Sequence, residues 1–275
     1  MGTSNSKKRE GKRTRGFSAS IVVVGCFILA LLFFNFVLGN PANFVDNDPA
    51  NHPLPNNYLG TIHKGGPVVC IVITLLMTTF ALSIERGFAI SKAKGKGDLI
   101  NFVYDVNKCL QASDIKGAEA LCDEQKGSVA SIVLAGLKKY SDMETTTEII
   151  SKEQKLLNIQ KEMEVATSLE LPTMEQNLPV IAAITTLGTL FGLLGTVIGM
   201  IRSFAALANA GSPDSVALAT GISEALVNTS LGIATGAAAI ISYSFFTGKI
   251  DNMTYAIDEM GFAIVQTYAA KHKNN

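Results

Sequence analysis

Four long apolar runs interrupt the polar chain, at residues 18–38, 67–84, 178–208 and 215–247. An α-helix rises 1.5 Å per residue, and the hydrocarbon core of a bilayer is about 30 Å thick, so roughly 20 apolar residues can span it. The pattern therefore predicts an all-α, polytopic membrane protein with long transmembrane helices. The last two runs are separated only by the short polar turn 209–214, which predicts a helical hairpin.

The segment between the second and third runs, residues 85–177, is amphipathic. Apolar residues such as Phe102, Val106 and Leu110 recur there at helical spacing. The segment is predicted to be a helical cytoplasmic domain continuous with the membrane helices, with helices near 99–110, 115–122, 129–140 and 145–169. Because proline lacks a backbone N–H, Pro172 and Pro179 predict a bend or break before the third run.

The distribution of lysine and arginine predicts which side of the membrane each segment occupies, because these residues concentrate in cytoplasmic flanks. They are frequent in the basic N-terminus 1–17, after the second run and in the C-terminal tail 248–275. By contrast, residues 39–66 contain Lys64 as their only lysine or arginine. The sequence thus predicts both termini in the cytoplasm, with residues 39–66 and the turn 209–214 on the opposite, periplasmic side.

Two alternatives concern the N-terminus. The first apolar run could be the core of a signal peptide, and its cleavage would leave three spans. The run is longer than the usual core of 7–15 residues and lacks a clear cleavage site, which favours a transmembrane helix. The basic cluster could instead bind nucleic acid, but its position directly before an apolar span favours a role in topology, and no nucleic-acid partner is expected.

Composition agrees with a membrane protein: 48% of residues are hydrophobic, 17% are charged, and the net charge is +0. The mean hydropathy is +0.30. His52 and His63 lie in a polar loop without a third clustered ligand, and the four cysteines are scattered, so neither a metal site nor a disulfide framework is expected. The sequence has no P-loop, dinucleotide fingerprint or HExxH motif, so neither an enzyme nor a bound cofactor is expected.

Polar residues inside the hairpin are candidates for a proton pathway. Thr196 lies about 15 residues before the middle of the turn and Thr229 about 18 residues after it, so the two lie at similar depth. Glu224, Asn228 and Thr235 share one helix face. The bland alternative is that Glu224 is a protonated hydrogen-bonding residue and that each threonine bonds its own preceding turn. The hairpin also contains glycines at a spacing that favours close packing of two helices: Gly188, Gly192, Gly195, Gly199, Gly232 and Gly236.

Two segments of the hairpin resemble a known family. Residues 192–200 read GLLGTVIGM, and residues 221–232 read GISEALVNTSLG. They resemble the GLLGTVxGM and GIxEALxxTxxG segments of the MotA/TolQ/ExbB proton-channel family, in the same order and with a turn between them. The resemblance is strong over residues 178–247, and the chain looks closest to ExbB. The run at 18–38 is an extra span relative to the ExbB pattern.

The resemblance implies an inner-membrane motor subunit that uses the proton motive force. Such subunits form a homopentamer around the single-span helices of a partner, ExbD or TolR, whose membrane aspartate carries protons. By motif position, Thr196 and Thr229 would line the proton route beside Glu224. A TonB-like protein would carry the work to the outer membrane. A TolQ-like subunit of a Tol-Pal system and a non-conducting scaffold remain alternatives, whereas the lack of an inverted repeat disfavours a secondary transporter.

Overall fold

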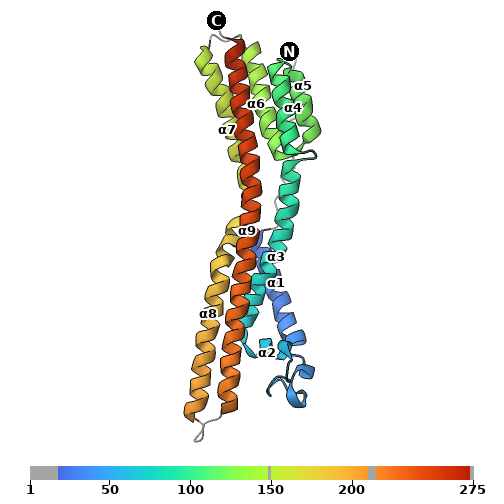
Figure 1. Ribbon diagram of the computed structural model, residues 1–275. Helices are drawn as coiled ribbons and strands as arrows, with labels where there is room; N and C mark the ends of the chain where they lie inside the picture. The colour runs from blue at the N-terminus through green and yellow to red at the C-terminus, as the bar shows by residue number, and fades with distance from the viewer. Residues whose placement is uncertain (1–17, 148–149, 210–214, 273–275) are drawn as a thin grey trace, which may run out of the picture.

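The structure is a computed structural model that describes residues 18–147, 150–209 and 215–272. The predictions for the basic N-terminus 1–17, for the turn residues 210–214 and for the last three residues of the tail lie outside these ranges. Within them the chain is helical and contains no strand, which confirms the predicted all-α class. Figure 1 shows an elongated molecule with one helix, α9, running through nearly its whole length.

In the part of the chain that the structure describes, four helical stretches are long and apolar enough to cross a membrane: Ala19–Leu38, Pro67–Gln111, Lys152–Ala205 and Leu218–Lys271. The chain is therefore a multi-pass membrane protein. The first stretch is α1 (Ala19–Leu32), continued by the π-helical Phe33–Leu38, and the last lies within α9 (Ser215–Lys271). The second stretch joins α3 (Pro67–Lys94) to α4 (Leu99–Gln111), and the third joins α7 (Lys152–Glu175) to α8 (Leu178–Asn209); the apolar runs of the sequence fall in α3 and α8. Both α3 and α9 continue well past the apolar runs, because charged residues favour solvent without breaking a helix.

In the described residues, four further helices form the α4–α7 bundle beside the distal half of α9 (Figure 1). They are α4 (Leu99–Gln111), α5 (Ile115–Gln125), α6 (Gly127–Thr145) and α7 (Lys152–Glu175). Of these, α4, α6 and α7 pack against α9, whereas α5 packs against α4 and α6. The apolar faces of the bundle and that of α9 form one core, which includes Val106, Val133 and Ile159 of the bundle and Met260 and Ile264 of α9. The amphipathic spacing of residues 85–177 thus reflects mutual packing of these helices.

One helix boundary differs from the sequence prediction. A helix was expected over residues 145–169, but Thr145 ends α6 and α7 begins only at Lys152. The side chain of Ser151 accepts a hydrogen bond from the backbone N–H of Gln154 at 3.3 Å, which caps α7 at its N-terminus. Threonines 145–147 are β-branched and favour helix interiors weakly, so the capping serine decides where the helix starts.

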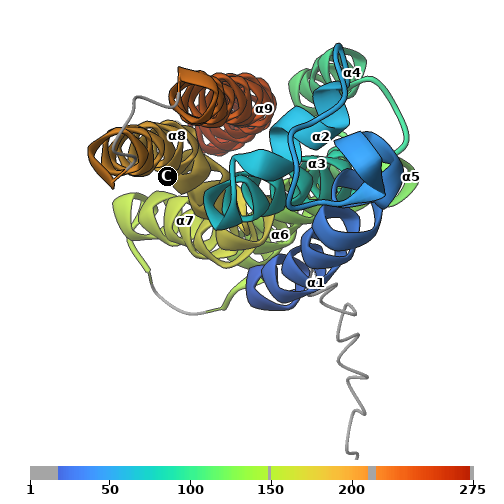
Figure 2. The ribbon, with the colours of Figure 1, turned by 90° about the horizontal axis from the view of Figure 1, so that it is seen from below.

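The connection between α1 and α3, residues 39–66, is folded rather than a plain loop. Asn43 donates to the carbonyl oxygens of Val37 and Leu38 at 2.9 and 3.0 Å, and Asn57 donates to the Asn43 side chain at 3.1 Å. Phe44 is 1% exposed. The connection includes the short helix α2 (Tyr58–Lys64) and leads into α3, beside which α1 lies (Figure 2).

Candidate functional site

The site is built where α8 and α9 approach each other backbone to backbone. A Cβ atom at Gly232 would lie 2.6 Å from both the carbonyl oxygen of Gly188 and the Cα of Gly192. At Gly192 it would lie 2.9 Å from the Cα of Gly232, and at Gly195 it would lie 2.5 Å from the Cβ of Asn228. These distances are shorter than ordinary van der Waals contacts. Glycine at these positions therefore permits the close packing typical of small-residue helix pairs.

The same close packing repeats along the hairpin in both directions. A Cβ atom at Gly188 would lie 3.1 Å from the backbone nitrogen of Gly236, and one at Gly236 would lie 2.8 Å from the Thr185 carbonyl oxygen. Towards the turn, a Cβ atom at Gly199 would lie 2.8 Å from the Cβ of Ala225. All six glycines singled out in the sequence thus lie on the α8–α9 seam.

Thr196 of α8 and Thr229 of α9 meet across this seam, with their hydroxyl groups in direct contact. The Thr196 hydroxyl also lies 3.3 Å from the Gly192 carbonyl oxygen and 3.4 Å from that of Ala225. The Thr229 hydroxyl lies 3.4 Å from the same Gly192 oxygen. Both residues are half-buried. A hydroxyl both donates and accepts, so the pair can exchange a hydrogen bond with a group that reaches its open edge.

The polar face of α9 points largely into the protomer. Asn228 is 2% exposed, and its Nδ2 donates to the carbonyl oxygen of Gly65, just before α3, at 3.1 Å. Thr235 is 0% exposed and donates to the carbonyl oxygen of Leu231 at 2.8 Å. Within a single protomer, these two residues are therefore held by α9 itself and by the start of α3.

Glu224 differs from its two neighbours on this face because it is only half-buried. The positive charges of Lys64 and Arg202 act on its carboxyl group. Lys64 ends α2, and Arg202 lies on α8, so three elements contribute charge at this level. Sequence periodicity placed Glu224 on the polar face, but it gave no signal for Lys64 or Arg202 as its neighbours.

Hydrogen bonds connect both ends of the apolar stretch of α3 to the helical hairpin formed by α8 and α9. Gly65, next to the start of α3, binds Asn228, and Glu85 binds Asn177 at the start of α8 at 3.2 Å. The two contacts are twenty positions apart in the sequence, and almost all of the residues between them belong to α3, which gives a separation of about 30 Å, the thickness of a bilayer core. The threonine pair therefore lies at the level of the start of α3, at one end of this apolar layer.

Comparison with known proteins bears on the same part of the chain. A family model described as the MotA/TolQ/ExbB proton channel family matches residues 124–259, which extend from the end of α5 into the second half of α9 and include both threonines.

Individual relatives match over most of their lengths. The Tol-Pal system protein TolQ of Haemophilus influenzae is 26% identical over 205 residues, which cover 71% of this chain and 86% of that protein. TolQ of Pseudomonas aeruginosa is 27% identical over 66% of this chain and 78% of its own length. The putative biopolymer transport protein ExbB-like 3 of Synechocystis sp. is 28% identical over 76% of this chain and 93% of its own length.

Proposed function

Because this chain belongs to the MotA/TolQ/ExbB proton channel family, we propose that it is an ExbB-like subunit of an inner-membrane motor that energises outer-membrane transport. In this proposal a homopentamer encloses an ExbD-like single-span partner that carries a membrane aspartate. A TonB-like protein then transmits the work. The α4–α7 bundle and both termini lie in the cytoplasm, as the distribution of lysine and arginine favours.

The observation that carries the proposal is the contact between the hydroxyl groups of Thr196 and Thr229 within the family-matched segment. Both hydroxyls are half-buried and face each other across a glycine-packed seam. A partner carboxylate at this level could accept a hydrogen bond from the pair when charged and donate one when protonated. The pair would thereby stabilise both protonation states of the partner.

The energy available from the proton gradient is sufficient for a conformational step. One proton moving through a membrane potential of ~150 mV releases ~3.5 kcal/mol, since each charge gains about 2.3 kcal/mol per 100 mV. A few kcal/mol is enough to shift a two-state equilibrium from a minor to a major population. Glu224, with Lys64 and Arg202 beside it, is proposed as a polar neighbour of the route rather than its proton carrier. Asn228 and Thr235, buried on the same face, are proposed to support the route from inside the protomer.

The test is to replace each hydroxyl with a methyl group of similar size, as Thr196→Val and Thr229→Val. We expect either change to lower proton-driven uptake in cells at least about tenfold while the purified ring keeps its mass in native mass spectrometry. The matched control is Thr254→Val, because the Thr254 hydroxyl donates within its own helix, at 3.1 Å from the Ile250 carbonyl oxygen, and far from the threonine pair. Normal uptake in both hairpin variants would refute the proposal in favour of a scaffold.

A TolQ-like subunit of a Tol-Pal system is the second candidate, because two TolQ proteins match this chain over most of their length. The two candidates share the ring and the threonine pair, so hairpin variants do not separate them. Complementation does: an ExbB-like subunit would restore energised uptake in a strain lacking ExbB, whereas a TolQ-like subunit would restore envelope integrity in a strain lacking TolQ.

A further inference from the structure

A buried arginine lies at the other end of the apolar stretch of α3. Arg86 is 1% exposed, although it sits in a segment whose charges the sequence suggests are simply a flank. Burying a guanidinium group is costly unless its donors find acceptors. The groups that accept hydrogen bonds from Arg86 therefore indicate which parts of the chain it connects.

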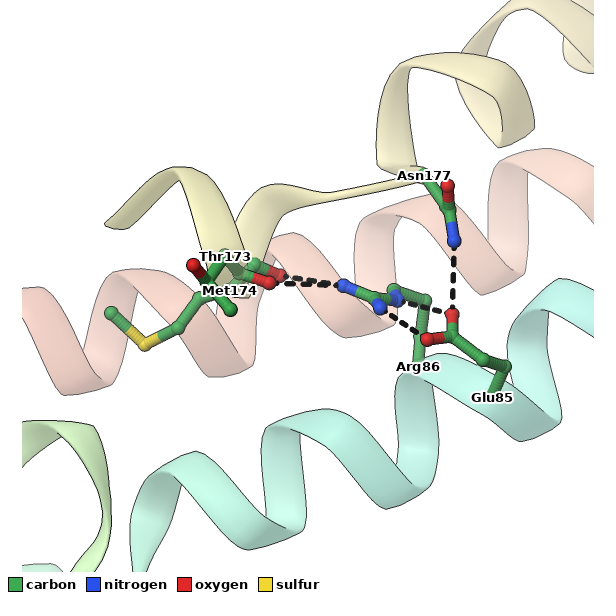
Figure 3. Close-up of polar contacts among 5 residues, drawn as sticks. All are labelled: Glu85, Arg86, Thr173, Met174 and Asn177. Carbon is green, nitrogen blue, oxygen red and sulfur yellow. Dashed lines mark hydrogen bonds and ion pairs between the residues drawn. The ribbon is translucent and has the colours of Figure 1, made fainter. Parts of the chain in front are cut away.

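The guanidinium group joins two separate parts of the chain (Figure 3). Its Nε donates to Oε2 of Glu85 at 2.6 Å, and its Nη2 is paired with Oε1 of the same carboxylate. Its Nη1 lies 3.3 Å from the carbonyl oxygens of both Thr173 and Met174, near the end of α7. The Glu85 carboxylate in turn accepts a hydrogen bond from the side chain of Asn177.

These acceptors lie where the helix is interrupted. In an unbroken helix, the carbonyl oxygen of Thr173 would accept from the N–H of residue 177, and that of Met174 from residue 178. Instead α7 ends at Glu175, and Asn177 adopts a positive φ of 68°. The carbonyl oxygen of Asn177 accepts from the N–H groups of Val180 and Ile181 as α8 starts. Arg86 thus supplies, from α3, donors to two carbonyl groups at the end of α7.

We propose that Glu85 and Arg86 form a clasp that makes the joint between α7 and α8, residues 173–178, rigid. The arginine holds the end of α7, and the glutamate holds the start of α8 through Asn177. The three helices α3, α7 and α8 then move as one body at this level. The interruption between α7 and α8, which could otherwise act as a hinge, is then a fixed bend, called the elbow below.

The clasp also positions the threonine pair, and this part of the proposal rests on the proposed function. Thr196 lies 19 residues beyond Asn177 along α8, which corresponds to about 28 Å. A change of about 5° in the elbow would displace Thr196 by about 2.5 Å, more than a hydrogen bond tolerates. Glu85 and Arg86 are therefore positioning residues that act on Thr196 through α8.

The experiment measures the elbow in the assembled full-length protein. Spin labels are placed at Glu164 on α7 and Leu190 on α8, both of which are exposed, with the partly exposed Cys109 replaced by serine. Labelled chains are diluted with unlabelled chains so that only distances within one protomer contribute. Electron–electron resonance then gives the distribution of distances between the two labels.

Two variants separate the clasp from simple misfolding. Arg86→Gln leaves the partly buried Glu85 carboxylate without its cationic partner, so this variant can fail to fold. The double variant Glu85→Gln/Arg86→Gln carries no charge at either position and is the decisive one. Lys92→Gln, an exposed lysine on the same helix, is the matched control.

We expect a single narrow distribution in the parent protein and in Lys92→Gln, and a broadened or shifted one in the folded, assembled double variant. Proton-driven uptake should fall at least about tenfold in that variant. An unchanged distribution in the double variant would overturn the clasp. A broadened distribution with normal uptake would overturn its positioning role alone. If the parent protein drives no uptake at all, the proposed function fails, and the distance distributions still decide the clasp.

Discussion

The glycines of the hairpin leave no space for a methyl group at its centre. Gly232 is the clearest case, because a Cβ atom there would lie 2.6 Å from backbone atoms on α8 that cannot rotate away. By contrast, Gly248 on the same helix has nothing within 4 Å of its would-be Cβ atom. The same substitution should therefore be more destabilising at Gly232 than at Gly248.

We predict that Gly232→Ala destabilises the protein by about 1–3 kcal/mol, since the two helices must move apart to accommodate the methyl group. Gly248→Ala should be neutral or stabilising by up to about 1 kcal/mol, because alanine is the better helix former. Thermal unfolding of both variants in the same detergent measures the difference. Equal melting temperatures would show that the glycines do not set the helix separation.

His63 is a second residue whose surroundings have a measurable consequence. Its ring stacks on Phe34 with centroids 4.5 Å apart and meets the edge of Phe44 at 5.5 Å, and its Nδ1 is buried without a partner in the described residues. Burial, and secondarily the adjacent Lys64, lower the pKa of His63 below its ordinary value of 6.5. The folded protein therefore favours the neutral ring.

The sign of the pH effect follows from this lowered pKa. The unfolded chain binds a proton on His63 more readily than the folded chain, so the contribution of His63 to stability is present above pH 6.5 and is lost as the pH falls below it. We predict that the melting temperature declines between pH 7 and pH 5 and that His63→Gln reduces this decline. His52→Gln, at an exposed position, is the control. A decline of the same size in His63→Gln and in the parent protein would contradict the assignment.

At the scale of elements, regular helices were predictable because their pattern is local. The apolar spacing of Phe102, Val106 and Leu110 predicts α4 without knowledge of its partners. The polar turn likewise predicts that α8 and α9 pair. The direct contact between Thr196 and Thr229 agrees with the similar depth expected from counting residues along the two arms.

Features that depend on tertiary contacts were not predictable. The sequence of residues 39–66 is typical of a loop, yet the segment is folded, in part because the side chains of Asn43 and Asn57 bond the end of the first span and each other. Asn228 was predicted to face a polar track, but its partner is a carbonyl group 163 positions away. From the sequence, Arg86 indicated only that the segment after the second apolar run is cytoplasmic. Its burial was not predictable, because the neighbouring residues do not show that an arginine is buried.

At the scale of the whole molecule, α1 packs against α3 and lies on the side of α3 away from α8 and α9 (Figure 2). Many of its apolar side chains, such as Ile21, Val24 and Leu29, are more than half exposed. These residues suit contact with lipid. The extra span thus leaves the α8–α9 seam unobstructed.

The proposed topology places the connection 39–66 and the α4–α7 bundle on opposite sides of the membrane. We predict that a membrane-impermeant thiol reagent labels Asn56→Cys in intact cells and labels Lys116→Cys only after the inner membrane is permeabilised. Both positions are exposed, and Cys109 is replaced to remove background labelling. Labelling of both positions from the same side would contradict the topology.

The helix α9 has a mechanical consequence that its partner α8 lacks. It runs unbroken over 57 residues, so it is a rod about 85 Å long, with Thr229 about 21 Å from its start and Tyr268 near its end. The path through α8 and α7, by contrast, crosses the interruption between Glu175 and Leu178, which the proposed clasp of Glu85 and Arg86 holds. A rotation of α9 at the threonine pair would be transmitted along the helix, because α9 has no interruption that could absorb it. It would reach, about 58 Å away, the bond of the Tyr268 hydroxyl to the Met143 carbonyl oxygen. A movement of the threonine pair would therefore also move the contact between Tyr268 and Met143 at the far end of the bundle.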